Sequence, residues 1–460
     1  MEGKKASYRE LVKQNRALRR ENRQLRQRIA ELEQKVLDLQ DKLEEAVGRG
    51  LRQAAPFRVA EKRKKDNPGQ PGRKPGHKGV WRRRPDHVDE RVEVPLDRCP
   101  QCGGPVYRVK PVEQYIEDIP QVRPHVTHLI TYTGRCRQCG RVRTHHPLQT
   151  SIATGAAGVH LGPRALGLAS DLSKRLGLTC RKTCEVLRAH FGLSVSPGGL
   201  VQALRRVSGR LEHAYEQLQA QIRASPTVYA DETSWWVGEA GWWLWVFTTP
   251  KQTVYVVQKS RGQGVVAAML GGSYGGTLVS DCLNSYDPIQ CTKHKCYAHH
   301  LKAIAEARGQ APDSQFLHDI RLLLKTAVAI GTDPDISSER KREFVQGLER
   351  WADVLLGAVY TEPWEQRIAN RLRKQRQHLF TFLYQEGVDP TNNRAERQLR
   401  PAVIARKVSC GNKTERGKHT WEVLTSIAST CDQNGTRFAS FVSQAMPLCA
   451  PPQQLTLTPR

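Results

Sequence analysis

Two short cysteine motifs restrict the fold of this chain more strongly than any other part of its sequence. Cys99 and Cys102 form one CxxCG motif, and Cys136 and Cys139 form a second. Two thiols at this spacing can share one ion, and the glycine lets the chain turn tightly around the sulfurs. Four thiolates give the closed tetrahedral site that structural Zn²⁺ prefers. We therefore predict a four-cysteine zinc ribbon holding one Zn²⁺, in which Val106–Tyr132 forms a β-hairpin or a similar extension; an iron–sulfur cluster or a redox pair is the alternative.

The net charge of the chain indicates the chemistry of its partner. Lys and Arg number 72 against 45 Asp and Glu, which gives a net charge of +27. This excess favours a polyanionic partner, nucleic acid before an acidic membrane, although a basic enzyme whose charge only aids solubility is the alternative. No apolar run approaches the ~18 residues that cross a bilayer, and the densely charged N-terminal segment excludes a secretory signal. We expect a soluble intracellular protein, whose reducing surroundings favour metal binding over disulfides for closely paired cysteines.

The N-terminal segment carries a heptad repeat. Its d positions are leucines seven residues apart, and its a positions include two asparagines and two β-branched residues. This pattern favours two strands, and buried asparagine at a fixes the register of the helices. We predict a parallel homodimeric coiled coil, with a single amphipathic helix packed on its own core as the alternative. The leucines are Leu11, Leu18, Leu25, Leu32 and Leu39, and the a positions are Tyr8, Asn15, Asn22, Ile29 and Val36.

A basic arm follows the heptads. Arg58–Arg84 contains eleven Lys or Arg and only two acids, interrupted by repeated Pro and Gly. Pro and Gly at this density prevent a packed core, so we expect a flexible arm that contacts DNA phosphates, or else a merely solvated linker. The expected DNA contacts in the arm are Arg63, Lys64, Lys65, Arg73, Lys74, Lys78, Arg82, Arg83 and Arg84.

The segment Leu161–Ala224 is predicted to be helical. Thr179 is a candidate N-cap for a short helix through His190, and Gly192 ends it. Ser196 and Pro197 then suit the N-cap and first position of a longer helix. A helix-turn-helix and a plain helical hairpin fit this pattern equally well.

The pattern then changes to strands. Three β-rich runs, at Pro226–Ala230, Trp242–Thr249 and Thr253–Val257, precede a helix at Gln263–Leu270 and a fourth strand at Thr277–Ser280. This order predicts the opening of a ribonuclease H-like mixed sheet. The following residues, from 299 to about 386, are helical, and the tryptophans of the strands are expected to pack in the sheet more often than to stack on bases. The expected core positions of the helical part are Leu322, Leu323, Leu324, Trp351, Leu355, Leu356, Phe380 and Phe382.

Three acids are placed where they could meet. Asp231 ends the first predicted strand and Asp281 the fourth, so neighbouring strands would bring them to one sheet edge. Glu396 would lie on the first turn of a helix capped by Asn392 or Asn393. Three converging carboxylates would repel one another unless divalent cations occupied the site, and two Mg²⁺ ~4 Å apart would support phosphodiester displacement. The alternative is that these acids are N-caps and ion-pair partners.

Other polar residues surround these acids. Basic residues near Glu396 would clamp DNA phosphates, and those expected to do so are Arg394, Arg397, Arg400, Arg406 and Lys407. Cys180 and Cys184 are expected to be core residues. A Cys/His-rich stretch follows Asp281, for which we favour an organising role beside the active site over a second metal; it comprises Cys291, His294, Cys296, His299 and His300.

Taken in order, these motifs resemble the DDE transposases of the insertion sequence 66 family. The resemblance covers about Leu11 to Phe441, and Asn392–Arg397 is its most specific stretch. It implies that Asp231, Asp281 and Glu396 are the DDE triad, with an all-helical insertion between the last two. It also implies that Cys296 and His299 belong to the family's Cys-x-x-His-type motif, as active-site organising residues. In one departure, Cys282 follows Asp281, where the family more often has glycine.

The expected protein is thus a multidomain α+β transposase that cuts DNA at the ends of a mobile element and joins the 3′-hydroxyls to a target. Its cofactors would be two Mg²⁺ per active site, replaceable by Mn²⁺, and one structural Zn²⁺. Its partners would be double-stranded DNA (element ends and target), a second copy through the coiled coil, and accessory proteins of the same element, without a membrane. The expected location is the bacterial cytoplasm, at the nucleoid. The alternatives are a catalytically inactive DNA-binding regulator and a simple nuclease.

The predicted domains follow from these features. They are a parallel coiled coil (1–50), a basic Pro/Gly-rich arm (51–98), a four-cysteine zinc ribbon (99–146), a helical, HTH-like region (150–224), a ribonuclease H-like core with the first two catalytic Asp (225–300), a helical insertion (301–388), the catalytic Glu helix with the C-terminal part of the core (389–445), and a tail (446–460).

Overall fold

The computed structural model describes residues 82–151 and 158–447, together with Gln24 and Gly76. The predicted coiled coil and the arm up to residue 81 lie outside the described residues, apart from those two positions, so both stay predictions. The chain divides into two compact units, Met1–Asp118 and Ile119–Arg460. The boundary between them falls inside the predicted zinc ribbon.

Residues 82–118, in the first unit, are extended and contain no helix or regular strand. An isolated β-bridge joins Arg98 and Pro105, so the chain folds back on itself around the first CxxCG motif. Arg84 forms an ion pair with Glu113 at 3.7 Å, and its guanidinium lies 5.5 Å from the centre of the Tyr115 ring. The segment 106–132 remains extended without strands, which differs from the predicted hairpin. Its apolar side chains face solvent, so no burial favours regular pairing.

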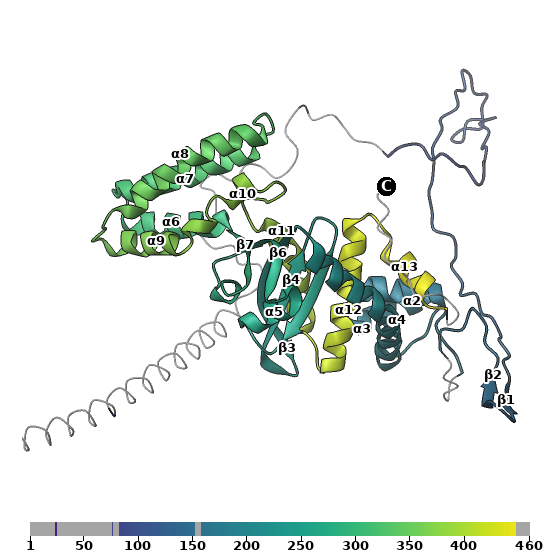
Figure 1. Ribbon diagram of the computed structural model, residues 1–460. Helices are drawn as coiled ribbons and strands as arrows, with labels where there is room; N and C mark the ends of the chain where they lie inside the picture. The colour runs from purple at the N-terminus through teal and green to yellow at the C-terminus, as the bar shows by residue number, and fades with distance from the viewer. Residues whose placement is uncertain (1–23, 25–75, 77–81, 152–157, 448–460) are drawn as a thin grey trace, which may run out of the picture. The chain divides into compact units, whose positions relative to one another are not determined.

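A five-stranded mixed sheet forms the centre of the second unit (Figure 1). The strand order is β5-β4-β3-β6-β7: the first three strands are antiparallel, and β6 and β7 run parallel to β3. The predicted order of three meander strands, a helix and a fourth strand is therefore confirmed. The strands are β3 (Thr227–Val237), β4 (Glu239–Thr248), β5 (Thr253–Gln258), β6 (Ser273–Ser280) and β7 (Gln290–Lys295).

Two details of the sheet differ from the sequence prediction. Strands β3 and β4 extend well beyond the facing ends of the predicted runs Pro226–Ala230 and Trp242–Thr249, and Gly238 alone joins them, with φ of 68°. A fifth strand, β7, was not predicted, since all of its residues except Cys291 are polar or charged. It is nevertheless buried at its C-terminal end, where Lys293, His294 and Lys295 lie within the protein.

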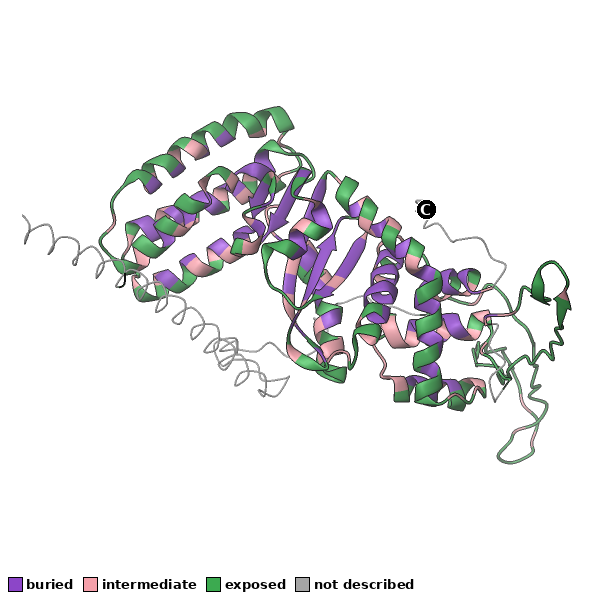
Figure 2. Cartoon of the chain, turned by 60° about the horizontal axis from the view of Figure 1, so that its bottom comes forward, coloured by how far each residue is buried: buried purple, intermediate pink, exposed green. Residues whose placement is uncertain are grey.

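Helices cover both faces of the sheet, so that its strands are largely buried (Figure 2). One apolar core joins one face of the sheet to the helices α2, α3, α4, α5, α12 and α13. A second core joins the opposite face to α11 and to the helices of the insertion. These helices are α2 (Pro163–Ser170), α3 (Cys180–Phe191), α4 (Pro197–Ala224), α5 (Gln263–Leu270), α11 (Asn393–Ser409), α12 (Glu415–Gln433) and α13 (Phe438–Ala445), with a π-helical turn at Asp171–Arg175 after α2.

The ends of α3 and α4 agree with the sequence signals. The Thr179 side chain accepts a hydrogen bond from the Lys182 N–H at 3.3 Å, and Gly192 ends α3 with φ of 64°. The Ser196 side chain accepts from the Gly199 N–H at 3.1 Å at the start of α4. Both predicted N-caps and the glycine stop are therefore confirmed.

The insertion between β7 and α11 is helical, as predicted. Leu323, Leu324, Phe380 and Phe382 are buried in it, but Leu322 is 46% exposed and its predicted core position is wrong. Three consecutive residues point in directions about 100° apart around a helix, so they cannot all face one core. The helices are α6 (Tyr297–Gln310), α7 (Gln315–Thr332), α8 (Ser338–Gly357), α9 (Pro363–Lys374) and α10 (Thr381–Tyr384), with 3₁₀ turns at Asn284–Tyr286, before β7, and Arg376–His378.

Strand β5 lies at one edge of the sheet, and α12 covers that edge. The backbone N–H groups of Thr253, Tyr255 and Val257 would lack strand partners there. They donate instead to side chains of α12: Thr430 Oγ1 (3.1 Å), Ser426 Oγ (2.9 Å) and Glu422 Oε1 (2.5 Å), respectively. Four residues advance about 6 Å along the axis of α12, which is close to the advance of two residues along β5. Side chains four residues apart on the helix therefore match N–H groups two residues apart on the strand.

Candidate active site

Asp231 lies within β3, opposite Val246 of β4. The prediction that it ends the strand is wrong, because β3 continues to Val237 through the hairpin with β4. Tyr229 belongs to the core on the α11 side of the sheet, and Ala230 to the core on the other side. Since side chains alternate along a strand, Asp231 is on the α11 side and Glu232 on the opposite side.

Asp281 directly follows the last residue of β6. In the parallel pairing of the two strands, Tyr229 of β3 lies opposite Val279 of β6. Asp231 and Asp281 therefore occupy equivalent places, each two residues beyond this pair. The Oδ1 atom of Asp281 accepts a hydrogen bond from the Leu283 N–H at 2.9 Å, which orients the carboxylate in the loop after the strand.

Glu396 comes from the first turn of α11, as predicted. The buried residues Ala395, Leu399 and Ala402 pack this helix into the core that covers β3 and β4, while Glu396 itself is exposed. A carboxylate in the first turn is favoured by the dipole of the helix.

The pKa of Asp231 is raised by burial and by neighbouring acids. Burial raises the pKa of Asp231 to about 8, and the negative charge of Glu232 is the next cause. The charges of Asp281 and Glu396 raise the pKa of Asp231 further. Negative charge from neighbouring acids thus acts on Asp231, and a divalent cation bound there would relieve it.

Glu232 belongs to a different network. Its buried carboxylate accepts hydrogen bonds from the Tyr286 hydroxyl at 2.7 Å and from Arg261 at 3.0 Å. Burial raises the pKa of Glu232, with the charge of Asp281 as the second cause. Nothing in the sequence pattern marked Tyr286 as its partner, because the two residues are far apart in the chain and meet only through the sheet.

Asn392 connects the elements that carry the acids. Its backbone N–H donates to Cys296 Sγ at 3.1 Å, and its Nδ2 donates to the Ala230 carbonyl at 2.8 Å. The residue is the N-cap of α11, but its side chain makes no capping hydrogen bond, so that part of the prediction is wrong. The amide instead binds α11 to the strand residue next to Asp231.

Two residues of the Cys/His-rich stretch lie close to Glu396. Cys296 Sγ, a ring nitrogen of His299 and a carboxylate oxygen of Glu396 lie within 4.8 Å of one another. His300 is engaged elsewhere: Cys282 Sγ lies 3.7 Å from its Nε2, and Arg371 donates to its Nδ1 at 3.3 Å. Burial lowers the pKa of His300 to about 3, so its imidazole is neutral. His294 likewise has the Pro390 carbonyl 3.1 Å from its Nε2.

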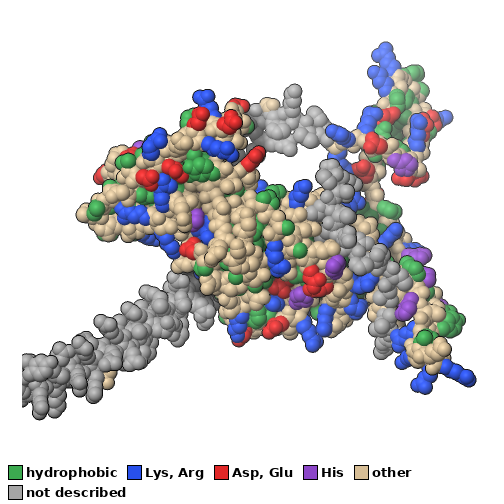
Figure 3. Space-filling model, in the orientation of Figure 1, with side chains coloured by type: hydrophobic (Ala, Val, Ile, Leu, Met, Phe, Trp, Pro, Cys, Tyr) green, Lys and Arg blue, Asp and Glu red, His purple; other side chains and the backbone are tan. Residues whose placement is uncertain are grey.

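The arginines expected to contact DNA fall into two groups. Arg394 pairs with Asp389 at 3.2 Å and lies 5.2 Å from the centre of the Tyr229 ring. Arg406 donates to Thr233 Oγ1 at 3.0 Å and so ties α11 to β3. The remaining basic residues of this set that the structure describes are exposed to solvent: Arg82, Arg83, Arg84, Arg397, Arg400 and Lys407. In Figure 3, Lys and Arg side chains are spread over the visible face of the sheet and the helices.

The tryptophans of the sheet pack mainly within it. Trp235, Trp242 and Trp245 are buried, as expected for sheet packing, and Trp243 is half-buried. Trp236 is 42% exposed. Cys184 is buried and Cys180 is half-buried against the same core, which confirms their prediction as core residues.

Each CxxCG motif forms a tight turn. Gly103 and Gly140 have φ of 72° and 71°, a conformation that favours glycine. Backbone N–H groups directed at the first sulfur, chiefly that of Cys102 in one motif and of Cys139 in the other, lower the pKa of Cys99 and Cys136. The second motif sits in a hairpin of β1 (Thr133–Cys136) and β2 (Gly140–Arg143). The pairs belong to different units, so their union in one zinc site stays a prediction.

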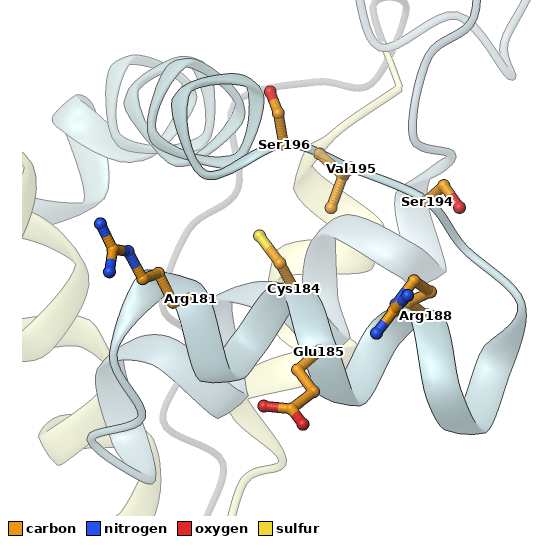
Figure 4. Close-up of a pocket in the computed structure, with 7 residues that line it drawn as sticks. All are labelled: Arg181, Cys184, Glu185, Arg188, Ser194, Val195 and Ser196. Atoms are coloured by element: carbon orange, nitrogen blue, oxygen red, sulfur yellow. The ribbon is translucent and has the colours of Figure 1, made fainter.

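A pocket of about 460 Å³ lies between α3 and the segment that leads into α4 (Figure 4). Cys184 points from α3 toward Val195, and arginines stand on both sides of it. The segment between α3 and α4 is short, which suits a helix-turn-helix and a helical hairpin alike. The residues that line the pocket are Arg181, Cys184, Glu185, Arg188, Ser194, Val195 and Ser196.

Fold and site together define an α/β protein with a mixed central sheet and carboxylates on adjacent strands and a neighbouring helix. Comparison with known proteins gives the family. The family model described as "Transposase IS66 family" matches residues 166–420, more than half of the chain. This chain therefore belongs to the IS66 transposase family, as its sequence motifs indicated.

Three relatives come from Sinorhizobium fredii (strain NBRC 101917 / NGR234) and bear the names uncharacterized protein y4qI, y4hP and y4jD. The first is 23% identical over 57% of this chain and 55% of its own length, so the chain spans about half of that relative. The second is 23% identical over 76% of this chain and 70% of its own length. The third is 21% identical over 76% of this chain and 75% of its own length. Among the helices that the structure describes, none is long and apolar enough to span a bilayer.

Proposed function

We propose that this chain is a DDE transposase that cuts DNA at the ends of a mobile element and joins the 3′-hydroxyls to target DNA. One observation carries the proposal. Asp231 and Asp281 occupy equivalent places on adjacent strands of the mixed sheet, and the charges of Asp281 and Glu396 help to raise the pKa of Asp231. A site with this much unbalanced negative charge suits divalent cations.

The three carboxylates would hold two Mg²⁺, for which Mn²⁺ can substitute. Bound there, the ions would activate a water or a 3′-hydroxyl and stabilise the leaving oxygen of the phosphodiester. The residues of the chain then have separate tasks. Asp231 is held by a β-strand and Asp281 by the hydrogen bond from Leu283, so both are preorganised. Glu396 is exposed and thus accessible to DNA and ions, while Cys296 and His299 would organise the site behind it.

The remaining parts would bind DNA and assemble the complex. The basic arm and the exposed Arg397, Arg400 and Lys407 would contact phosphates, and the zinc ribbon and helical region would recognise the element ends. The coiled coil would join two copies, and accessory proteins of the same element would take part. The protein would act in the bacterial cytoplasm, on DNA of the nucleoid.

The test is to incubate the purified protein with Mg²⁺ and DNA that carries the flanking ends of its element. A transposase nicks at the ends and produces joined target products. A DNA-binding regulator would bind the same ends without nicking, and a simple nuclease would cut without joining. Absence of any Mg²⁺-dependent cut at the ends would refute the proposal.

A further inference from the structure

A second set of metal-binding atoms lies beside the proposed magnesium ligands. Cys296 Sγ, a ring nitrogen of His299 and a carboxylate oxygen of Glu396 are within 4.8 Å of one another. Cys296 is fully buried at the N-cap of α6, and His299 lies on the first turn of the same helix. Glu396 comes from α11, so the set joins two helices that are far apart in the sequence.

The chemistry of this set differs from that of the three carboxylates. Mg²⁺ prefers oxygen ligands, whereas thiolate, imidazole and carboxylate together suit Zn²⁺. Zinc lies about 2.3 Å from sulfur and about 2.0–2.1 Å from nitrogen, which places tetrahedral ligand atoms about 3.5 Å apart. Rotation of the exposed Glu396 side chain can supply the small approach that is needed. Three protein ligands would leave a fourth position for water.

Unpartnered polar atoms support a ligand at this place. His299 Nδ1 is buried and has no hydrogen-bond partner among the described residues, and the same is true of Asn392 Oδ1. Asn392 is itself fully buried, and its backbone N–H contacts Cys296 Sγ. Buried polar atoms without partners are costly, and those that remain in native proteins commonly indicate an ion or water. The N–H directed at the sulfur is an outer contact of the kind that orients a metal ligand.

We infer that Cys296, His299 and Glu396 form a site for a thiophilic divalent cation such as Zn²⁺, and that its occupation withdraws Glu396 from the two aspartates. Zinc would then inhibit the chemistry that magnesium supports. The inhibition rests on the proposed function, whereas zinc binding does not.

Binding is tested on the full chain by equilibrium dialysis against Zn²⁺ and elemental analysis. Wild type should hold one more zinc per chain than Cys296→Ser or His299→Ala, and the matched control Cys291→Ser should keep the wild-type number. Co²⁺ in place of zinc should show a thiolate-to-cobalt absorption that is weaker in Cys296→Ser than in the control. If Cys296→Ser fails to fold, His299→Ala decides, because His299 is only half-buried. Equal zinc in wild type and His299→Ala would overturn the inference.

Inhibition is tested by the ratio of Mg²⁺-dependent cleavage with and without micromolar Zn²⁺, taken for each variant. Zinc should lower cleavage by about tenfold or more in wild type and in Cys291→Ser, and by less than about twofold in His299→Ala. Equal inhibition in wild type and His299→Ala would overturn the inference that bound zinc withdraws Glu396 from the magnesium site. If wild type shows no Mg²⁺-dependent cleavage, the proposed function fails, and the zinc count still decides whether the site exists.

Discussion

At the scale of single residues, the site depends on which face of a strand a side chain occupies. Asp231 and Glu232 are adjacent in β3, yet one lies on the side of α11 and the other contacts Tyr286 and Arg261 on the opposite side. Both carboxylates have a raised pKa, chiefly through burial. Perturbed acidity alone therefore does not separate the candidate metal ligand from its neighbour. The face of the sheet on which each carboxylate lies does separate them.

Substitution of the candidate metal ligands should abolish cleavage while DNA binding persists. The cleavage rate should fall about 10³-fold or more in Asp231→Ala, Asp281→Ala and Glu396→Ala, because each substitution removes a carboxylate that would position the metal ions. Double variants should be no worse than single ones. Binding should stay near wild type because its free energy comes mainly from basic residues. Cleavage assays and gel-shift titrations measure the two effects.

Glu232→Gln is the matched control for these variants. It keeps the size of the buried side chain and an oxygen for the Tyr286 hydroxyl, so most cleavage activity should remain. A folded Glu232→Gln chain that cannot cut, beside an Asp231→Ala chain that can, would show that the triad is misassigned.

His419 makes the stability of the fold depend on pH. Hydrogen bonding to Glu422, and then to Glu212, raises the pKa of His419 to about 9, above its ordinary 6.5. A group whose pKa is raised in the folded protein stabilises it fully below the unfolded pKa and loses this effect as pH rises through the folded pKa. The melting temperature of His419→Gln should thus fall below that of wild type at pH 6, and the difference should vanish by about pH 10. A difference that grows with pH would contradict this assignment.

At the scale of elements, two helices complete the sheet in different ways. Helix α11 brings Glu396 to the site and is bound to β3 through Asn392 and Arg406. Helix α12 contributes no candidate metal ligand and instead satisfies the backbone of β5. We expect variants of α11 to affect cleavage first and variants of α12 to affect stability first.

Ser426→Ala tests the second role. The substitution removes the acceptor for the Tyr255 N–H at a buried place, which should lower the free energy of unfolding by about 1–3 kcal/mol. Ser409→Ala is the control, because that exposed hydroxyl donates within its own helix, to the Ala405 carbonyl. Urea unfolding of both variants measures the difference, and equal stabilities would show that the contact with β5 contributes little.

At the scale of the whole molecule, much of the core could be predicted from the sequence. The meander strands, the caps at Thr179 and Ser196, and Glu396 on a first helical turn all follow from local patterns. Tertiary contacts decide the rest. Strand β7 is polar in sequence and forms because β6 lies beside it, and the Asn392 amide binds Ala230 rather than its own helix. The contact between Asn392 and Cys296 also joins residues on opposite sides of the helical insertion, which local patterns cannot reveal.

The predicted zinc ribbon is a property of the whole chain, because its two cysteine pairs lie in different units. One structural Zn²⁺ should bind through Cys99, Cys102, Cys136 and Cys139. Without metal, so short a module has little apolar core, and chelation should unfold it while the sheet remains folded. Circular dichroism and protease sensitivity before and after chelation measure this. A Cys102→Ser/Cys136→Ser chain that keeps the same zinc count as wild type would show that the ribbon is not a zinc site.

The side chains of α12 along β5 have a consequence for how the protein is made. An edge strand with free N–H groups is a template on which other chains can add strands. In β5 that template is closed by a helix that the ribosome reaches only after the helical insertion and α11. Until α12 has been synthesised, the edge of β5 in each nascent chain is therefore open to strand addition by other chains. A product truncated before Glu415 would lack this cover permanently, and we expect it to aggregate.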